Sequence, residues 1–417
     1  GTELAHQLLT GSNRVSVPLE LARTRDYPLL SQAGAVVRPE SAKNRKPPIR
    51  IELHPLIPGS TAEDEREQEL AGRIAALGLE AADQGARVLI LRNTVRGAVA
   101  VQRALLRQRP DRRNLWQVGG VPAIHHARFA RPDREHLDHA IQAAFGKGAD
   151  RRGGLVACAT QTVQQSLDLD ADLLITDLCP MDVLLQRIGR LHRHRDTPRP
   201  EGFQRPRCLL LTPEAATDDW LDVQGRPRLR HGLGTVYPDL AILAATLAEL
   251  RRRQDGEALI LNIPRDNRAL VEAAIHAESL QPWRTDGAWR LHANNVTGTG
   301  IQHRLQAKSA LVPWERPFLD PGVRFPGGEL DLLITTRLGE GDRRITWDGV
   351  RLSPFGKTLH EMTVPAWLLH GLDEDPSPCV HQDGQRLTIT YGGRHFIYDH
   401  LGLRRQDESS EDDHADA

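Results

Sequence analysis

Residues 153 to 193 read GGLVACATQTVQQSLDLDADLLITDLCPMDVLLQRIGRLHR, and this stretch decides the fold. It holds two short apolar runs, residues 155 to 159 and 173 to 175, and polar residues follow each run. In an open parallel sheet, ligands bind beyond the carboxyl ends of the strands. The polar residues 160 to 166 would lie at such an end, so the stretch predicts a binding site there.

Residues 180 to 193 are predicted to form a helix, because Pro180 suits a first helical position and Asp182 falls in the first turn. One stripe, at spacing i, i+4 and i+7, presents an amide and two guanidiniums: Gln186, Arg190 and Arg193. An apolar stripe lies on roughly the opposite side: Leu184, Ile188 and Leu191. One face is therefore expected to pack and the other to bind.

Guanidinium groups suit a transferring phosphoryl group, because they stabilise its spread charge without changing their own protonation. Arg190 and Arg193 are therefore candidate catalytic residues. A solvated basic helix face is the alternative for any isolated pair of arginines. The glutamine, the glycine and the preceding strand-loop-strand pattern favour the phosphoryl role here.

The same residues carry a family resemblance. Gln186, Arg187, Gly189, Arg190 and Arg193 match the sixth motif of superfamily 2 helicases, Q-R-x-G-R-x-x-R. Residues 160 to 168 resemble their fifth motif, and residues 87 to 100 would hold the fourth. The sequence of residues 158 to 194 resembles that of the CRISPR-associated helicase-nucleases that the Cascade complex recruits in type I interference.

The resemblance implies roles for individual residues. Arg190 and Arg193 would be arginine fingers, and the residues implied for ATP binding are Gln186, Arg187, Gly189 and Asp168, the last at the ribose. The residues implied near the DNA are Thr160, Gln161, Asn93, Thr94 and Arg128, the last from a family-specific H-S/A-R-F element at residues 126 to 129. The residues implied for coupling are Gln161, Gln164 and Gln165. An end-of-strand threonine and a turn-forming aspartate are the structural alternatives for Thr160 and Asp168.

Strands and helices alternate over residues 49 to 213, which predicts a parallel sheet covered by helices. Expected strands are 49 to 56, 88 to 91, 121 to 124, 155 to 159, 173 to 175 and 208 to 211. Expected helices run from Thr61 or Ala62 to residue 82, from 95 to 107 with Asn93 or Thr94 as the cap, from 132 to 145, and from 180 to 193. The fold class is therefore α/β, and the resemblance makes it RecA-like.

The expected domains follow this pattern. They are a remnant of a first RecA-like domain with a connector at 1 to 48, a second RecA-like helicase domain at 49 to 215, a linker at 216 to 256 with a long helix at 238 to 253, a smaller α+β accessory domain at 257 to 405, and a disordered acidic tail at 406 to 417. Short β-like runs are expected at 258 to 263, 332 to 336, 344 to 347, 387 to 391 and 395 to 398. IPRDNRALVEAAIH, TRLGE and FIYDHLGL resemble the family's accessory domain, where Trp283, Trp289 and Trp314 would fill a core or stack on bases.

Composition excludes few classes of function. Lys and Arg number 54 against 55 Asp and Glu, so any DNA-binding surface must be a local patch. The four cysteines show neither a metal spacing nor a disulfide framework, which predicts reduced, buried thiols and a cytoplasmic protein. No stretch has the length of a membrane-spanning helix, so no membrane partner is expected.

Several motifs are absent or misleading. No G-x-x-x-x-G-K-S/T, D-E-x-H, S-A-T or His-Asp sequence occurs, and SPFGKTLH lacks the first glycine of a phosphate loop because Arg351 holds that position. Asp168, Asp170 and Asp172 alternate like a calcium loop, but Leu173 stands where glycine is obligatory. The histidine pairs at 125 to 126 and 192 to 194 lack further zinc ligands, so no metal site is expected in this chain.

The leading hypothesis is the carboxyl-terminal part of an ATP-dependent single-stranded DNA translocase coupled to a nuclease in CRISPR antiviral defence. ATP with magnesium would be bound mainly by a missing amino-terminal half, the nuclease metal would belong to a missing nuclease domain, and this chain alone would be inactive. Expected partners are single-stranded DNA, a Cascade-type complex and that missing half. Two alternatives stay open: a non-catalytic DNA-binding or Cascade-docking module, and another superfamily 2 helicase.

Overall fold

The structure is a computed structural model and describes residues 30–32, 35–37, 47–59, 64–164, 167–254, 256, 259–309, 343–369 and 377–406. Some expectations concern residues outside these ranges. They are the helix start at Thr61 or Ala62, Gln165, Trp314, the strand at 332 to 336 and the acidic tail from 407 onward.

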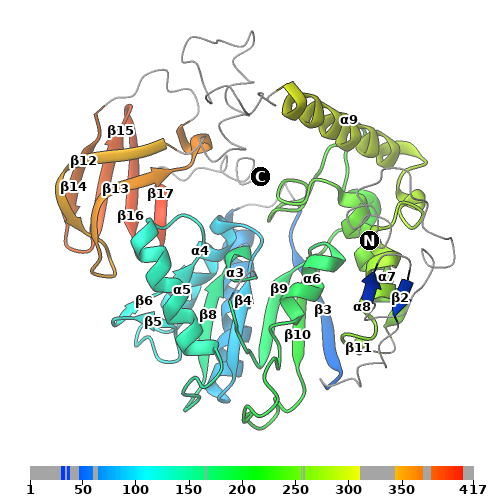
Figure 1. Cartoon of the computed structure of the whole chain (residues 1–417), viewed down its shortest axis with the longest axis horizontal. Coiled ribbons are helices and arrows are strands. Elements are labelled where there is room, and N and C mark those ends of the chain that lie inside the picture. The colour runs from blue at the N-terminus through cyan, green and yellow to red at the C-terminus, as the bar shows by residue number, and fades with distance from the viewer. Residues whose placement is uncertain are drawn as a thin grey trace.

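A seven-stranded sheet forms the centre of the described residues (Figure 1). In spatial order its strands are β11 (Leu259–Leu261), β3 (Ile49–Ile57), β10 (Arg207–Pro213), β9 (Leu173–Asp177), β4 (Arg87–Leu91), β8 (Leu155–Ala159) and β7 (Ile124–His125). All neighbours pair in parallel except β11, which runs antiparallel to β3. The predicted α/β fold with a predominantly parallel sheet is therefore confirmed.

The central strands are buried over most of their length. In β4, β8 and β9, Ile90 pairs with Cys158 on one side and with Ile175 on the other, and all three side chains are fully buried. Continuous apolar runs of this kind suit strands that helices cover on both faces. The sheet therefore holds the main core and fixes the loops that follow its strands.

Several of the described helices pack on this sheet or on one another. Their bounds are Asp64–Asp83 (α3), Val95–Gln108 (α4), Arg131–Phe145 (α5), Met181–Ile188 (α6), Leu240–Arg253 (α7), Asn267–Ile275 (α8) and Gly287–Ser309 (α9), and four short 3-10 helices lie at Gln161–Val163, Thr217–Asp219, Gln281–Trp283 and Ala366–Leu369. α3 packs on α4, β4 and β8, whereas α6 contacts α7 and α8. Thr94 caps α4 as predicted, because its hydroxyl accepts from the Gly97 backbone N–H at 3.0 Å.

Two predicted elements have different bounds in the structure. The helix expected over 180 to 193 ends at Ile188, because Leu191 forms a β-bridge with Ala171 and His192 takes a left-handed backbone conformation with φ 42°. The strand expected over 121 to 124 is divided. Its first half, β6 (Val121–Pro122), pairs back on β5 (Gln117–Val118), and only β7 joins the central sheet.

The carboxyl-terminal described residues form antiparallel sheets. β12 (Arg343–Leu352) pairs with β13 (Thr358–Val364), and β14 (Cys379–Asp383), β15 (Arg386–Tyr391), β16 (Arg394–Asp399) and β17 (Gly402–Arg405) form a four-stranded sheet. These strands lie beside α5 in Figure 1. A separate hairpin joins β1 (Leu30–Gln32) and β2 (Ala35–Val37).

The cysteines agree with the prediction at three of four positions. Cys158, Cys179 and Cys208 are free and buried, whereas Cys379 is free but exposed on β14. Burial raises the pKa of the Cys158 thiol to about 12 and that of Cys179 to about 11, so these thiols stay protonated at neutral pH. No helix within the described ranges is long and apolar enough to span a membrane.

Candidate functional site

The loops after β4, β8 and β9 meet at the carboxyl edge of the sheet. A buried ion pair joins two of them, with Arg92 Nε 2.9 Å from the Asp177 carboxylate and both side chains at most 1% exposed. The backbone N–H of Asn93 also donates to Asp177, and its side-chain amide donates to the Leu178 carbonyl. This edge is therefore a tightly bonded polar layer above the apolar strands.

Arg187 lies inside this layer and not on its surface. It is fully buried on α6. Its guanidinium donates to five oxygens: Gln164 Oε1 at 2.9 Å, Thr176 Oγ1 at 2.7 Å, Asn93 Oδ1 at 2.9 Å, the Tyr237 hydroxyl at 3.1 Å and the Asp177 carbonyl at 3.3 Å. In this conformation Arg187 connects several loops, and it has no surface for direct contact with ATP.

Arg190 lies in the turn that follows α6 and is 8% exposed. One terminal nitrogen donates to the Gln164 carbonyl, whereas its Nε is buried without a hydrogen-bond acceptor in the described part of the chain. Burial and the neighbouring Arg193 lower the pKa of Arg190, and Asp168 opposes this shift. A second anionic ligand would relieve both effects.

Arg193 is more accessible, with 41% of its side chain exposed. Its Nε lies 2.5 Å from a carboxylate oxygen of Asp168, and His194 Nε2 lies 3.1 Å from the other oxygen. Its backbone N–H donates to the buried Asp170 at 2.8 Å. The structure thus brings together Arg190, Arg193 and Asp168. The two arginines project from a turn, however, and do not share a helix face as predicted.

The remaining residues of the sixth motif differ in accessibility. Gln186 is exposed on α6, and Gly189 is the C-cap of that helix. Gln186 is therefore available to a ligand, whereas Gly189 supports the turn that carries Arg190.

The residues expected near DNA are mostly engaged within the protein. Asn93, Thr94 and Thr160 are each 2% exposed. Thr160 anchors its own loop, since its backbone N–H donates to the His125 carbonyl at 3.0 Å. Gln161 is partly exposed and donates to the Asn93 carbonyl at 2.8 Å. Of these four residues, Gln161 is therefore the most accessible to a ligand.

Arg128 lies elsewhere, in the contact between the central sheet and the carboxyl-terminal strands. Its carbonyl accepts from the Leu403 N–H at 2.8 Å. In the same segment the His126 imidazole contacts the Leu401 carbonyl at 3.1 Å and accepts from the Arg128 N–H at 3.1 Å. His126 Nε2 therefore carries the proton. We call residues 126 to 130 the docking segment.

Further polar contacts close this junction. Asp133 on α5 accepts a hydrogen bond from Ser353 at 2.6 Å and another from the Tyr398 hydroxyl, which in turn accepts from the Ala130 N–H at 3.1 Å. Burial raises the pKa of Asp133, and the hydrogen bonds from Ser353 and Tyr398 oppose this shift. The sequence pattern did not indicate these contacts, because their partners are more than 200 residues apart.

The sequence does carry a signal for two other residues of this edge, Arg92 and Asp177. Arg92 and Asp177 stand at the ends of apolar strands, where a charged residue within a buried run requires a partner. Tyr237 and His231 lie in the segment before α7 and carried no comparable pattern. The sequence pattern could therefore predict the ion pair, but not the nearby contacts that His231 and Tyr237 make.

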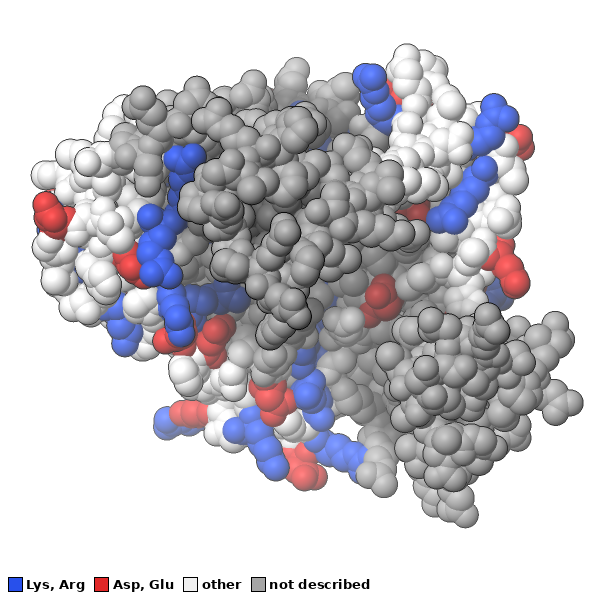
Figure 2. Space-filling model, turned by 45° about the horizontal axis from the view of Figure 1, so that its top comes forward, with Lys and Arg blue, Asp and Glu red and all other residues white. Residues whose placement is uncertain are grey.

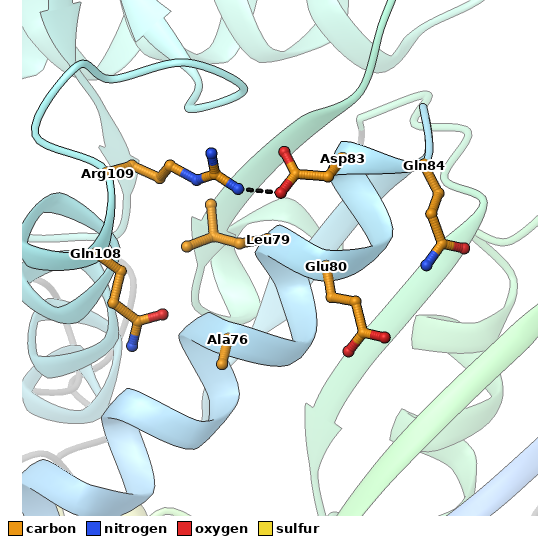
Figure 3. Close-up of a pocket in the computed structure, with 7 residues that line it drawn as sticks. All are labelled: Ala76, Leu79, Glu80, Asp83, Gln84, Gln108 and Arg109. Atoms are coloured by element: carbon orange, nitrogen blue, oxygen red, sulfur yellow. Dashed lines mark hydrogen bonds and ion pairs between the residues drawn. The ribbon is translucent and has the colours of Figure 1, made fainter.

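A pocket elsewhere is unrelated to this edge (Figure 3). It lies between α3 and α4, and Arg109 forms an ion pair with Asp83 across it. Because α3 ends at Asp83 and β4 begins at Arg87, this pocket lies toward the amino end of the sheet. Within the described ranges, no group of three or more His, Cys, Asp or Glu side chains forms a candidate metal site.

The parallel sheet with its flanking helices is the α/β fold that the sequence predicted. Residues 84–196 match the family model described as CRISPR-associated nuclease/helicase Cas3, C-terminal. Over these residues the chain is recognised as similar to the carboxyl-terminal part of Cas3.

Curated relatives support this recognition. The chain is 43% identical over 161 residues to the CRISPR-associated endonuclease/helicase Cas3 of Thermus thermophilus, a match that covers 39% of this chain and 16% of that protein. It is 41% identical over 136 residues to Cas3 of Escherichia coli, covering 33% of this chain and 14% of that protein. These matches therefore span only a small part of the relatives' length.

Solved structures share the fold over most of the chain. The structure of T. fusca Cas3 with ADP superposes with a TM-score of 0.66 at 23% identity, covering 96% of this chain and 48% of that chain. A chain of a CRISPR RNA-guided surveillance complex, pre-nicking, gives a TM-score of 0.62 at 24% identity, covering 90% and 48%. At this identity the likeness concerns the fold alone.

Proposed function

We propose that this chain acts as the carboxyl-terminal portion of an ATP-dependent single-stranded DNA translocase coupled to a nuclease in CRISPR defence. The observation that carries the proposal is the buried Nε of Arg190, which lacks an acceptor among the described residues and lies near a second arginine, in the turn after α6 that pairs with Ala171 ahead of β9. Buried donors are rarely left unsatisfied, so an anionic group is the natural partner for this position. The phosphates of ATP are such a group.

In this proposal Arg190 is held by the Gln164 carbonyl and turns its remaining donors to a phosphate. Arg193 exchanges its ion pair with Asp168 for the phosphate, and both guanidiniums stay protonated throughout. The exposed amide of Gln186 lies on the preceding helix and supplies a neutral donor. Asp168 then becomes available to the ribose.

The magnesium and the phosphate loop belong, in this proposal, to an amino-terminal half that faces Arg190 and Arg193. A nuclease metal would belong to a further domain. T. fusca Cas3 has been solved with ADP and with AMPPNP, which supports nucleotide as the shared ligand. The surveillance-complex structure supports a Cascade-type partner.

For DNA we propose that Gln161 makes direct contact, because it is the partly exposed member of the expected set. Asn93, Thr94 and Thr160 would instead shape the loops that face the strand, since their side chains are buried. On the face drawn in Figure 2, Lys and Arg side chains lie beside Asp and Glu side chains in several places. DNA contact would therefore depend on local patches and would weaken with salt.

The test is DNA-stimulated ATP hydrolysis by this chain supplied with its cognate amino-terminal half. Arg190→Ala and Arg193→Ala should each lower kcat by about 10³-fold or more, as expected for arginines at a transferring phosphoryl group. Arg195→Ala is the matched control, because Arg195 is an exposed arginine two residues beyond Arg193.

Activity that survives both substitutions would contradict the assigned roles. Salt-sensitive DNA binding without ATP turnover in any combination would instead support a non-catalytic DNA-binding or docking module.

A further inference from the structure

A line of hydrogen bonds joins the candidate finger Arg190 to the segment before α7. The Tyr237 hydroxyl accepts from an Arg187 terminal nitrogen at 3.1 Å. Arg187 Nε donates to the Gln164 side chain at 2.9 Å, and the Gln164 carbonyl accepts from Arg190. Three hydrogen bonds therefore separate the Tyr237 ring from the guanidinium proposed to face ATP.

Arg187 is suited to transmit position along this line. It is fully buried, and its planar guanidinium has donors at fixed angles. Because bulk water does not reach a fully buried guanidinium, a donor that loses its acceptor there cannot simply bond to solvent instead. If Tyr237 moves, Arg187 must therefore shift to keep its hydrogen bonds, and Gln164 must shift with it.

The segment that carries Tyr237 is held by hydrogen bonds within itself and by contacts with its neighbours. The Tyr237 N–H donates to the Gly232 carbonyl, and the Gly234 N–H donates to the Tyr237 carbonyl, each at 3.0 Å. His231 contacts Arg92 at 3.2 Å and Glu67 at 3.0 Å. This segment, residues 231 to 237, is therefore fixed to the carboxyl edge of the sheet at two points.

On its other side the segment leads into the helices that follow. The first N–H of α7, from Leu240, donates to His292 Nε2 on α9 at 3.0 Å, and His292 Nδ1 then donates to the Gly225 carbonyl at 3.0 Å. These hydrogen bonds connect α9 to the start of α7, three residues beyond Tyr237. A displacement of α7 or α9 would therefore shift residues 231 to 237 and, through Arg187 and Gln164, Arg190.

We propose that Tyr237 is a positioning residue for ATP hydrolysis, which aligns Arg190 through Arg187 and Gln164. This inference rests on the function proposed above and adds a regulatory input to it. Arg190 is aligned when residues 231 to 237 lie against the central sheet. It loses alignment when α7 and α9 move this segment away.

The experiment compares Tyr237→Phe with the unmodified chain, each supplied with the cognate amino-terminal half, in DNA-stimulated ATP hydrolysis. The substitution removes only the hydroxyl and keeps the ring in place. We expect kcat to fall about 3- to 10-fold, the effect of losing the hydrogen bond between Arg187 and the Tyr237 hydroxyl, with the KM for ATP within about twofold of the starting value.

Tyr391→Phe is the matched control, because Tyr391 is a buried tyrosine, 2% exposed, in the carboxyl-terminal sheet. It should change kcat less than about twofold. A double-mutant cycle with Arg190→Lys, which keeps the charge but loses the planar donors, separates positioning from general damage. In that background Tyr237→Phe should have almost no further effect on kcat.

The outcomes distinguish the inference from the function on which it rests. If the unmodified pair of halves hydrolyses no ATP, the proposed function fails. If Arg190→Ala abolishes turnover while Tyr237→Phe leaves kcat unchanged, the function stands and the inference is overturned. Equal losses from Tyr237→Phe with Arg190 and with Lys at that position would also overturn it, because the hydroxyl would then act independently of Arg190.

Discussion

At the scale of single residues, Arg187 is a buried cation whose five acceptors are all uncharged oxygens. The nearby carboxylate of Asp177 is already paired with Arg92. Each hydrogen bond of a buried charged donor contributes more than a neutral one, and removal of the donor leaves its acceptors unsatisfied. Arg187 therefore contributes to stability as well as to position.

We expect Arg187→Ala to lower the free energy of unfolding by about 3 kcal/mol or more, because several buried oxygens lose their donor together. Urea denaturation of the chain measures this change. Arg195→Ala, at an exposed position, should stay within about 0.5 kcal/mol of the unmodified chain. Equal effects of the two substitutions would show that the buried network does not stabilise the fold.

The sequence contained part of this information. At helical spacing, Arg187 lies three residues after Leu184 and four before Leu191, so it falls on the apolar side of α6. The motif suggested an ATP contact, whereas the spacing indicated burial. The partners Asn93 and Tyr237 could not be inferred, because they lie 94 and 50 residues away along the chain.

At the scale of elements, the docking segment and β17 approach one another closely. Gly402 has a φ of +77°, and a Cβ there would lie 2.4 Å from His126 Cε1 and 2.9 Å from the Arg128 carbonyl oxygen. Phe129 stacks on the His126 ring, with centroids 4.6 Å apart. The absence of a side chain at Gly402 therefore permits the carboxyl-terminal sheet to reach the central one.

Gly402→Ala should lower the free energy of unfolding by about 1–3 kcal/mol more than Gly393→Ala, because an inserted methyl group must displace packed atoms. Gly393 is a matched control in the same sheet. Its φ of +74° gives a similar backbone cost, but its Cβ would meet nothing within 4 Å. Thermal unfolding of both variants measures the difference, and hydrogen exchange at residues 126 to 130 should rise only in Gly402→Ala. Indistinguishable variants would rule out the close approach as a source of stability.

The end of α6 shows what an element's own sequence cannot specify. Its helical pattern continues to Arg193, yet the helix ends at Ile188 because Leu191 bridges to Ala171, twenty residues earlier. Asp170 then accepts from the Arg193 N–H and from Arg199. A long-range strand contact and a buried carboxylate thus decide where the candidate arginines lie.

At the scale of the whole molecule, burial keeps a set of histidines neutral. Desolvation is the largest cause that lowers the pKa of His125, His126, His192, His292 and His400, with His192 at about 4. These residues lie in the central sheet, the docking segment, the turn after α6, α9 and the carboxyl-terminal sheet. Protonation in acid would therefore affect most parts of the fold together.

The free energy of unfolding should fall as the pH decreases below about 6.5. A histidine whose folded pKa is lowered binds fewer protons in the native state than in the unfolded state, so acid favours unfolding below the unfolded value. At pH 5.5 we expect a loss of about 1 kcal/mol for each of His126 and His192, the most strongly shifted.

Urea midpoints at pH 7.5 and 5.5 test this expectation. Glu52 and Glu67, each with a pKa lowered to about 2, lose their contribution only below about pH 4.5 and do not interfere. Asp133, whose pKa is raised by burial, acts in the opposite direction as the pH falls. Equal or higher stability at pH 5.5 would contradict the histidine argument.

The parallel sheet was predictable as a whole because its signal is repeated. Apolar runs such as residues 88 to 91 alternate with helical periods, and this pattern has few possible arrangements. α9 was not predicted, since Gly298 and Gly300 interrupt a helix with little apolar periodicity. The docking of the carboxyl-terminal sheet depends on pairs such as Asp133 and Ser353, which local patterns do not encode.

The edge strand β11 has a practical consequence for dividing the protein. It follows α7 in sequence, yet it pairs with the outer edge of β3 at residues 49 to 51. A fragment that ends at residue 215 or 256 would leave the outer edge of β3 unpaired at residues 49 to 51, and an unpaired strand edge favours self-association through strand pairing. A fragment that keeps this edge paired therefore extends through Leu261.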